Sequence, residues 1–581
     1  MPSPTTSGLT TAVSLPSPLL NGWQTIDALL PSSARKWGGN QGTGAVLSYS
    51  FAWINGLSAL YTGPDGQAYS PLNEPGATYH YGLNTQQQTA ARLALGAWAT
   101  VANLYFSGVT ESGTQVGDIR FAWTSATDTT STGDKAWGWA NYPNSYWPSA
   151  GDVWLSSVST ASKDKDWSVG SYNCMSLMHE IGHTLGLKHS FSGDYTLPTA
   201  LDIRSYSIMS YTDATRSEWV EVTQTASGGH VWNSTTIVPS TPMVGDILAI
   251  QYLYGANTNA NTGDNLYDLD PTQPFYKTIW DAGGNDTLSA TRFAQPCTIN
   301  LNEGSYSSLG FKSNWSQYSQ LNWPTSPNPA TMYDGTNNLG IAWGVVIENA
   351  TGGSGADTLT GNPANNRLVG GPGNDTIDGG LGDDRLEGDA GNDTLTGGLG
   401  TDTAVYLSPR SNYKVEKTST GWRVTDSTSG DGTDTLQTIE RLSFANRQVA
   451  LDLDGHAGSV ARVLGAVFGD ASVLAHPDYV GIGLYYMDTL GYSALTLAGY
   501  ALTARLGTTP TPQQVVELLY TNVMHQAPSS AERDAFVNLL KSGTYNYASL
   551  SDLAALTPQN ATNIQLTGLS NTGLDYLAYA G

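Results

Sequence analysis

Three histidines stand close together in one segment of the chain, which reads His179-Glu-Ile-Gly-His183-Thr-Leu-Gly186-Leu-Lys-His189. On an α-helix, residues four apart share a face, so His179 and His183 can present two imidazole nitrogens to one metal ion. Gly186 can adopt the left-handed conformation that lets the chain leave a helix and turn back, which brings His189 round as a third ligand. Three protein ligands leave a position open for water, as in a catalytic rather than a structural zinc site.

Glu180 directly follows the first of these histidines. Zinc lowers the pKa of a bound water towards ~7, Glu180 can accept its proton, and the hydroxide can attack a carbonyl polarised by the metal. The alternative is that unrelated surface or core histidines fell at this spacing by chance. With 8 histidines in 581 residues, roughly 0.0015 such triplets are expected at random. We therefore interpret the segment as a catalytic zinc site.

The stretch Ser207-Ile-Met209-Ser-Tyr211 follows downstream. An extended zinc motif followed by such a Met-turn is the metzincin signature. Together the two stretches resemble the serralysin family of secreted bacterial metalloproteases. The resemblance implies that Met209 forms the Met-turn beneath the zinc. It also implies that Tyr211 is an additional zinc ligand, which leaves the metal when substrate binds and hydrogen-bonds the oxyanion.

The likeness to the serralysins covers residues of about 25 to 405 and includes KAWGWANYP, GDVWLS and GDILAIQYLYGAN. It implies that residues 136–142 lie near the cleft and pair with extended substrate, whereas burial of the two tryptophans in this segment is the alternative. His230 is expected to be structural. Cys174 is expected to be buried and inert, and a disulfide bond between Cys174 and Cys297 stays open.

Residues 352–405 form six consecutive nine-residue units, of which GGSGADTLT, GGPGNDTID and GGLGDDRLE fit Gly-Gly-x-Gly-x-Asp-x-apolar-x throughout. Glycine supplies tight turns and carbonyl oxygens, and aspartate supplies the hard anionic ligand that calcium prefers. Units 18 residues apart should stack, which aligns Asp357 with Asp375 and Asp393, and Asp384 with Asp402. A flexible linker is the alternative, but it would not keep one apolar residue in register.

These units resemble the parallel β-roll of RTX proteins. In the repeats, the implied calcium ligands are Gly353, Gly355, Asp357, Gly371, Gly373, Asp375, Gly380, Gly382, Asp384, Gly391, Asp393, Gly398, Gly400 and Asp402. Ahead of the repeats, the implied ligands are Asp264, Asp281, Gly283, Asp286 and Glu348, for which ordinary Asp/Gly turns are the alternative. The RTX resemblance also implies export from a Gram-negative cell by a type I secretion exporter, which reads an uncleaved C-terminal signal.

We expect a multidomain chain with an α+β metzincin-like zinc protease domain, a parallel β-roll of RTX nonapeptide repeats and a mainly α-helical C-terminal domain. The expected boundaries are 1–40 for a mobile leader or pro-segment, 41–257 for the protease, 258–454 for the calcium-binding roll and 455–581 for the helical domain with the export signal. Regular structure is expected to begin near Val46. Predicted helix starts include an N-cap at Thr85, an N-cap at Thr511 and a capping box from Ser529 to Glu532.

Charge and composition exclude other classes of function. The chain has 25 Lys and Arg against 49 Asp and Glu, a net charge of −24, so its surface should repel nucleic acids. Two cysteines are too few for a disulfide framework. Neither an N-terminal signal peptide nor eighteen consecutive apolar residues is visible, so we expect no membrane span.

These observations predict a secreted zinc-dependent endopeptidase that acts on protein or peptide substrates, with one catalytic Zn²⁺ and several structural Ca²⁺. The alternative is a non-enzymatic RTX surface or adhesive protein with a vestigial protease domain. The sequence retains the three histidines, Glu180, Met209 and Tyr211, which favours the enzyme. The C-terminal domain has no catalytic constellation, and its roles in attachment to the cell surface, surface retention or export stay open. Its histidines are interpreted as ordinary residues: His456, His476 and His525.

Overall fold

The computed structural model describes residues 11–14, 24–54, 69–70, 72, 74–112, 115–126, 137–144, 148–158, 166–428, 430–579 and 581. The chain forms two compact units, each described by itself below. The first comprises residues 1–288 and 297–347, and the second comprises residues 289–296 and 348–581.

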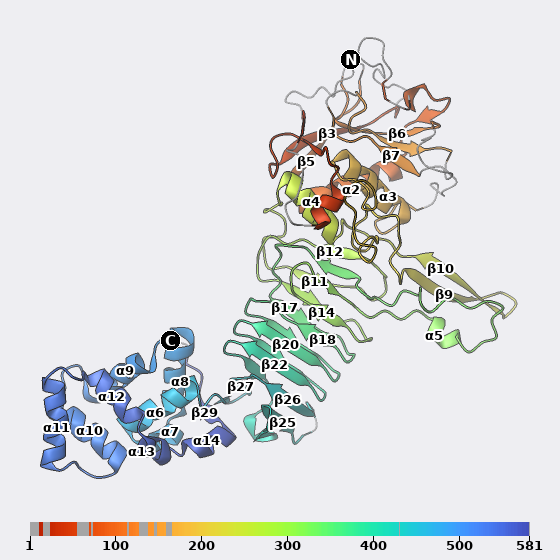
Figure 1. Cartoon of the computed structure of the whole chain (residues 1–581). Coiled ribbons are helices and arrows are strands. Elements are labelled where there is room, and N and C mark those ends of the chain that lie inside the picture. The colour runs from red at the N-terminus through yellow and green to blue at the C-terminus, as the bar shows by residue number, and fades with distance from the viewer. Residues whose placement is uncertain are drawn as a thin grey trace. The chain divides into compact units, whose positions relative to one another are not determined.

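The first unit is built on a mixed six-stranded sheet whose strand order is β5-β3-β6-β8-β7, with β4 paired to β6. Strands β3, β5, β6 and β8 run parallel, while β4 and β7 are antiparallel to their neighbours. Helices α2 and α3 lie together beside this sheet (Figure 1). The bounds are β3 Ala45–Phe51, β4 His80–Tyr81, α2 Thr85–Val101, β5 Leu104–Gly108, β6 Ile119–Thr124, β7 Gly138–Ala140, β8 Val153–Ser156 and α3 Tyr172–Thr184.

The helix predicted to start near Thr85 and the helix predicted to carry His179 and His183 are both present, as α2 and α3. Helix α2 begins at Thr85, but its N-cap is Asn84, whose side chain accepts a hydrogen bond from the Gln87 amide. The predicted N-cap at Thr85 is therefore wrong by one residue, because Asn84 forms a capping box with Gln87.

The N-terminal segment differs from the prediction. The structure forms β1 (Ala12–Ser14), α1 (Gln24–Leu29) and β2 (Arg35–Trp37) there, and α1 packs against α4 (Val244–Tyr254). Leu29 and Trp37 are buried, and the Trp37 indole donates to the Thr184 carbonyl at 2.7 Å. A mobile leader up to residue 40 and regular structure only from Val46 are therefore wrong for residues 24–40. Residues 1–10 and 15–23 of the predicted leader lie outside the described residues.

The remainder of the first unit contains a two-stranded hairpin and short strands. The hairpin strands β9 and β10 pair antiparallel from Glu218 to Thr236. Strand β16 pairs parallel with β12 and antiparallel with β15. The bounds are β9 Glu218–Gln224, β10 His230–Thr236, β11 Leu266–Asp268, β12 Lys277–Ile279, β13 Thr287–Ser289, β14 Thr298–Asn300, β15 Tyr306–Ser307, α5 Trp315–Tyr318 and β16 Leu339–Ile341, with a 3₁₀ turn at Glu74–Gly76.

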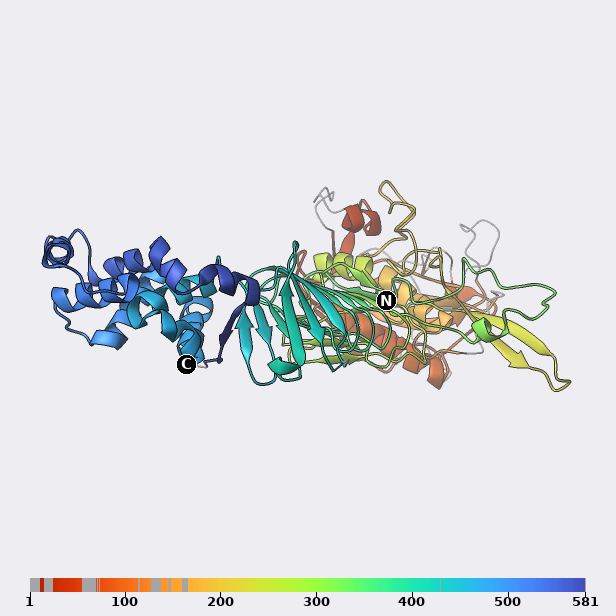
Figure 2. The ribbon, with the colours of Figure 1, turned by 90° about the horizontal axis from the view of Figure 1, so that it is seen from below.

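The second unit begins with the β-roll, whose strands alternate between two stacks. One stack pairs β17, β19, β21, β23 and β27 in parallel, and the other pairs β18, β20, β22 and β26 in parallel. Figure 2 shows these strands, in teal, side by side. Strands β24 and β25 form an antiparallel hairpin between β23 and β26 in the sequence. The bounds are β17 Asn349–Thr351, β18 Thr358–Thr360, β19 Arg367–Val369, β20 Thr376–Leu381, β21 Arg385–Glu387, β22 Thr394–Leu399, β23 Thr403–Val405, β24 Tyr413–Lys417, β25 Trp422–Asp426, β26 Thr433–Gln437, β27 Arg441–Ser443 and β28 Gln448–Ala450.

The predicted stacking of repeats 18 residues apart is confirmed. Leu359 lies opposite Ile377, and Leu368 lies opposite Leu386. These apolar side chains are fully buried. Each repeat thus contributes one side chain to a continuous core, which a flexible linker cannot do.

The chain after the roll is helical, as predicted. Its helices enclose a core that includes Val460, Leu464 and Leu519. The N-cap at Thr511 and the capping box of Ser529 with Glu532 are confirmed. Strand β29 (Leu574–Tyr576) pairs with β28. The helix bounds are α6 His456–Phe468, α7 Asp470–Ala475, α8 Pro477–Leu484, a π-helix Tyr485–Thr489, α9 Ala494–Leu506, α10 Pro512–Met524, α11 Ser530–Lys541, α12 Tyr547–Ala555, α13 Pro558–Asn563 and α14 Leu566–Thr572. Among the described residues, no helix is both long enough and apolar enough to cross a membrane.

Candidate active site

Helix α3 and the turn after it position the three histidines. The helix starts at the N-cap Ser171, and its end is closed by two hydrogen bonds, from the Gly186 amide to the His183 carbonyl and from the Leu187 amide to the Gly182 carbonyl. This is a Schellman ending, which requires a left-handed residue at Gly186, whose φ is 108°. A Cβ at Gly186 would lie 2.6 Å from the Arg35 carbonyl oxygen, so no larger residue fits this turn.

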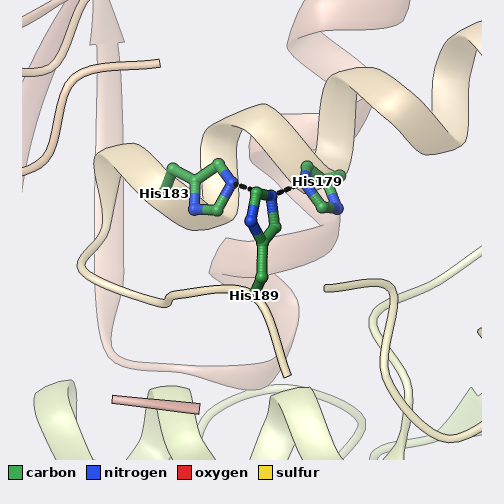
Figure 3. Close-up of side chains that lie close together, drawn as sticks. All are labelled: His179, His183 and His189. Carbon is green, nitrogen blue, oxygen red and sulfur yellow. Dashed lines mark hydrogen bonds between the residues drawn. The ribbon is translucent and has the colours of Figure 1, made fainter. Parts of the chain in front are cut away.

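The imidazoles of His179, His183 and His189 converge at one point (Figure 3). Nε2 of His189 lies 3.0 Å from Nε2 of His183 and 3.2 Å from Nε2 of His179. A tetrahedral zinc ion with Zn–N bonds of about 2.0–2.1 Å separates its ligand nitrogens by about 3.3–3.4 Å. The donor set and its spacing therefore fit zinc, and the sequence prediction that these residues come together is correct.

Backbone carbonyls hold two of the rings in the orientation that a metal needs. Nδ1 of His179 donates to the Ile208 carbonyl and Nδ1 of His183 donates to the Leu187 carbonyl, both at 2.7 Å. This arrangement places the proton on Nδ1 and leaves Nε2 as the free donor atom. Burial, and to a lesser extent the neighbouring histidine, lower the pKa of both imidazoles to about 3. Both rings are thus neutral at physiological pH, as metal ligands must be.

Met209 is fully buried against α3, the helix that carries His179 and His183. A Cβ built at Gly182 would lie 2.8 Å from Met209 Sδ and 3.2 Å from Cζ2 of Trp98. Gly182 is the residue immediately before His183, so the absence of a side chain there lets Met209 pack directly against the helix that carries two of the histidines. The predicted position of Met209 under the site agrees with this contact.

Tyr211 and Glu180 flank the convergence point. The Tyr211 hydroxyl lies 3.0 Å from Nε2 of His189, within reach of a metal bound by the three histidines. Glu180 is buried at 6% exposure, and its charge raises the pKa of Tyr211 in addition to the larger effect of burial. The pKa of Tyr142 is raised to about 12, first by burial and then by Glu180. The two phenols therefore keep their protons and face a carboxylate.

Asp246 supports the site and was missed by the sequence analysis. It is fully buried on α4; its Oδ2 accepts the amides of Ile208 and Met243 at 2.8 Å, and its Oδ1 accepts the Ser207 hydroxyl at 2.6 Å. Burial raises the pKa of Asp246 to about 6. Because the Ile208 carbonyl holds His179, this carboxyl fixes the turn that orients a predicted zinc ligand. The residue lies in the GDILAIQYLYGAN stretch, where nothing in the spacing marked it.

The segment at 137–142 lies beside the site, as the resemblance implied. Strand β7 (Gly138–Ala140) is the last strand of its sheet and pairs only with β8 among the described strands. The Tyr142 ring lies 5.4 Å from the His183 ring. Trp137 and Trp139 are half-buried, and their indoles donate to Asn173 and Glu74. The tryptophans hold the strand in place, and its outer edge is left for pairing.

The remaining histidines and the cysteines are not part of the three-histidine cluster. The His230 ring packs 5.1 Å from the Tyr318 ring. Both cysteines are buried and neither forms a disulfide bond, which excludes the Cys174–Cys297 disulfide in this structure. Burial raises the pKa of Cys174 to about 11, which keeps it a thiol. His456 pairs with Asp488 in the helical part.

The predicted calcium residues ahead of the repeats occupy one pair of turns in the first unit. Asp264 Oδ1 accepts the Asn285 amide at 2.9 Å, and Asp286 Oδ1 accepts the Asn265 amide at 2.8 Å. Asp281 accepts the amide of Gly283, which itself has a φ of 133°. Glu348 belongs to the second unit, where its backbone carbonyl accepts the Arg367 amide at 3.2 Å.

The predicted calcium residues of the repeats line the turns of the roll. The carboxylates aligned in the two stacks are nearly fully buried: Asp357, Asp375, Asp393, Asp384 and Asp402. The Asp357 amide donates to Asp375 Oδ1 at 2.7 Å, and the Asp384 amide donates to Asp402 Oδ1 at 2.9 Å. The second carboxylate oxygens of Asp375, Asp384, Asp393 and Asp402 are buried and have no hydrogen-bond partner.

Calcium fits these orphaned oxygens, because a buried anionic oxygen without a donor requires a cation. The glycines of the turns make room for the carbonyls. A Cβ at Gly398 would lie 2.0 Å from the Gly380 carbonyl oxygen. The other predicted glycines stand at the repeat position of Gly398 or two residues after it: Gly353 and Gly371 at the first, and Gly355, Gly373, Gly382, Gly391 and Gly400 at the second.

Comparisons with known protein families agree with this arrangement. Residues 77–217 match the family model described as matrixin, and residues 246–321 match the peptidase M10 serralysin C-terminal model. Residues 351–386 and 369–404 match the RTX calcium-binding nonapeptide repeat. The chain thus combines a matrixin-type peptidase region with RTX repeats in a multidomain layout.

Curated relatives carry the name serralysin or a related one. The chain is 33% identical to metallopeptidase AprA of Pseudomonas marginalis over 334 residues, which cover 53% of this chain and 61% of that protein. It is 34% identical to serralysin of Photorhabdus luminescens over 308 residues, covering 49% and 54%. It is 32% identical to serralysin B of Dickeya chrysanthemi over 345 residues, covering 56% and 60%. The chain therefore spans between 54% and 61% of the length of these relatives, and the predicted resemblance to serralysins is confirmed over that part.

Proposed function

We propose that this serralysin-like chain is a zinc-dependent endopeptidase that hydrolyses peptide bonds of proteins and is stabilised by calcium. The observation that carries the proposal is the convergence of three histidine Nε2 atoms, 3.0 and 3.2 Å apart, beside the buried Glu180 and the Tyr211 hydroxyl. These residues supply three metal ligands, a proton acceptor and a hydrogen-bond donor, which are the groups that zinc-dependent peptide hydrolysis needs. The rival function, a surface protein with a vestigial protease domain, requires no such complete set.

In the proposed mechanism, His179, His183 and His189 hold one zinc ion. Zinc supplies a Lewis acid that polarises the substrate carbonyl and favours loss of a proton from water. Glu180 accepts that proton and delivers it to the leaving amine. Tyr211 keeps its own proton, because its pKa is raised by burial and by Glu180, and its hydroxyl donates a hydrogen bond to the oxyanion of the tetrahedral intermediate.

The substrate is an extended peptide that adds to the free edge of β7. This strand ends the sheet among the described strands, and Tyr142 follows it beside the histidines. An exposed edge offers main-chain donors and acceptors to an incoming strand, which gives affinity without dependence on sequence. Unfolded or loosely folded proteins are therefore the favoured substrates.

We assign a role to each domain within the predicted boundaries. We assign residues 41–257 to the protease, with residues 24–40 joined to it, residues 258–454 to the calcium-binding roll and residues 455–581 to the helical domain. Calcium binding favours folding outside the cell, which fits passage of the unfolded chain through a type I exporter. Attachment to the cell surface is assigned to the helical domain, which carries no catalytic group.

The test is digestion of a reduced and carboxymethylated protein by the full chain in millimolar calcium, with cleavage sites mapped by mass spectrometry. Internal cleavage that stops when zinc is removed with 1,10-phenanthroline, and returns when zinc is added, supports the proposal. A folded, zinc-loaded chain that cleaves no unfolded protein would instead assign the non-enzymatic role.

A further inference from the structure

The β-roll contains a turn that the six contiguous repeats do not account for. Strand β22 is followed in its stack by β26, with Leu395 opposite Leu436, although the β24–β25 hairpin separates the two strands in the sequence. Asp434 consequently stands next to Asp393, at a sequence separation of 41 residues instead of the 18 found between regular repeats. The match to the RTX repeat model ends at residue 404, so this turn lies outside it.

The Asp434 carboxylate makes the contact that the carboxylates of the regular repeats make. The Asp357 amide donates to Asp375 Oδ1 at 2.7 Å, and the Asp375 amide donates to Asp393 Oδ1 at 2.8 Å. The Asp393 amide donates to Asp434 Oδ1 at 3.0 Å. The same atoms meet in the same order, so Asp434 occupies the aspartate position of a further repeat.

The backbone of the turn repeats the regular geometry as well. Gly432 has a φ of 77° and bridges in parallel to Gly391, whose carbonyl oxygen would lie 2.0 Å from a Cβ at Gly432. Gly432, Asp434 and Leu436 stand at the spacing of the third glycine, the aspartate and the apolar residue of Gly-Gly-x-Gly-x-Asp-x-apolar-x. The insertion of the hairpin hides this repeat from a search for contiguous units.

The carboxylate next to Asp434 carries one of the orphaned oxygens described above. Asp393 is 1% exposed, and its Oδ2 has no hydrogen-bond partner. This oxygen faces the backbone of its own loop, because a Cβ at Gly388 would lie 2.2 Å from it. A buried carboxylate oxygen without a donor is costly unless a cation takes the place of the donor.

The surroundings of this oxygen are strongly negative. Asp434 is 2% exposed, and burial raises the pKa of both Asp393 and Asp434, to about 6 and about 7. The charge of Asp431 contributes to both increases, and it also raises the pKa of Asp389. Four carboxyl groups therefore influence one another across the two adjacent turns.

We propose that a calcium ion binds between the loop of residues 388–393 and the turn of residues 431–434, and closes the roll. Its ligands are the carboxylates of Asp393 and Asp434 together with backbone carbonyl oxygens of the two turns, the hard oxygen set that calcium takes at about 2.3–2.6 Å. This inference rests on the proposal that the roll as a whole binds calcium. It adds Asp434, a residue outside the contiguous repeats, to the metal ligands.

A calcium ion at this turn also affects the strand that follows β26. Strand β26 leads into β27, where Arg441 forms ion pairs with Asp452, just before α6, and with Asp488 of the helical part. An ion that fixes β26 against β22 therefore also fixes the strand that carries Arg441. The proposed ion is thus linked to the helical part through Arg441 and Asp488.

The direct test uses crystals of the full wild-type chain grown in calcium, with anomalous diffraction data collected to locate the ions. We expect a peak within about 2.3–2.6 Å of Asp393 Oδ2 and of an Asp434 carboxylate oxygen. If a peak lies between Asp375 and Asp393 but none lies between Asp393 and Asp434, the inference is overturned while the calcium role of the roll stands. If neither pair holds a peak, both proposals fail.

Calcium binding to variants of the full chain gives a second readout. Equilibrium dialysis against radioactive calcium should show one ion fewer per chain for Asp434→Asn than for the wild type. Asp454→Asn, the same chemical change at an exposed position, should bind the wild-type number. An unchanged number of ions in a folded Asp434→Asn variant overturns the proposal. If circular dichroism shows that this variant does not fold, the wild-type crystals decide.

Discussion

Asp246 and His179 are joined through a single residue, Ile208. The Ile208 amide donates to Asp246 Oδ2 at 2.8 Å, and the Ile208 carbonyl accepts the Nδ1 proton of His179 at 2.7 Å. The carboxyl thus orients a predicted zinc ligand through the amide and the carbonyl on either side of the Ile208 Cα. Partners of this kind typically change metal affinity by 10- to 100-fold when removed.

We predict that Asp246→Ala weakens zinc binding about 10- to 100-fold, because the amides of Ile208 and Met243 lose their acceptor. Asp246→Asn should stay close to the wild type, because its carbonyl oxygen can accept both amides while its NH₂ group donates to Ser207. Competition with a zinc chelator measures the affinity of each variant. Equal loss in both variants would show that the charge of Asp246, rather than its geometry, is needed.

Gly182 is predicted to be intolerant of any side chain. In Gly182→Ala the new Cβ would lie 2.8 Å from Met209 Sδ, so we expect the free energy of unfolding to fall by about 1–3 kcal/mol from overpacking. The matched control is Gly96→Ala on the exposed face of α2, where a Cβ meets nothing within 4 Å. That change should stabilise the helix by about 0.5–1 kcal/mol. Urea unfolding compares the two variants, and similar effects of both would contradict the contact with Met209.

The N-terminal segment from residue 24 is predicted to be part of the folded protease. The Lys188 amide donates to the Leu29 carbonyl at 2.8 Å, next to His189, and Leu29 is fully buried. A chain beginning at residue 24 should keep full activity, whereas a chain beginning at residue 38 should lose stability and turnover. Thermal unfolding and peptide hydrolysis of the two truncations provide the measurement. Full activity of the shorter chain would show that these contacts are dispensable.

Calcium and protons are predicted to compete for the roll. Burial raises the pKa of Asp375 to about 7 and those of Asp384 and Asp402 to about 6. Groups whose pKa is raised on folding stabilise the protein when protonated, and this stabilisation is lost as the pH rises through the folded pKa. In chelator, the unfolding temperature should therefore fall between about pH 5 and pH 8.

Millimolar calcium should remove that loss, because the ion then neutralises the carboxylates at neutral pH. Differential scanning calorimetry at pH 5 and pH 8, with calcium and with chelator, separates the two effects. A calcium-free roll that is equally stable at both pH values would contradict the assignment of these buried aspartates as metal ligands.

The sequence predicted the parts of the fold that depend on local spacing. The histidine spacing on α3, the turn at Gly186 and the 18-residue register of the roll follow from helix geometry and from a fixed repeat length. Asp246 could not be found in this way, because it contacts the Met-turn from a helix 37 residues after Met209, and nothing local to Asp246 reveals that contact. The burial of Leu29 and Trp37 was missed for the same reason. Both residues pack on elements distant in the sequence, whereas the Ser- and Pro-rich composition around them predicts a mobile segment.

Asp434 could be recognised from the sequence only in part. Its turn carries the glycine, the aspartate and the apolar residue of a repeat at the regular spacing, so the signal was present in the sequence. The inserted hairpin broke the contiguous pattern, and only the parallel pairing of β22 with β26 restores the register. A search for single nonapeptides beyond the first interruption would have found it.

The most direct test of the central claim compares Glu180→Ala with the wild-type chain in zinc content and in hydrolysis of an unfolded protein. Because the three histidines remain, Glu180→Ala should hold one zinc ion per chain, measured by atomic absorption. Its turnover should fall by several orders of magnitude, because the attacking water loses the group that accepts its proton. A zinc-loaded Glu180→Ala variant with near wild-type turnover would contradict the proposed endopeptidase mechanism.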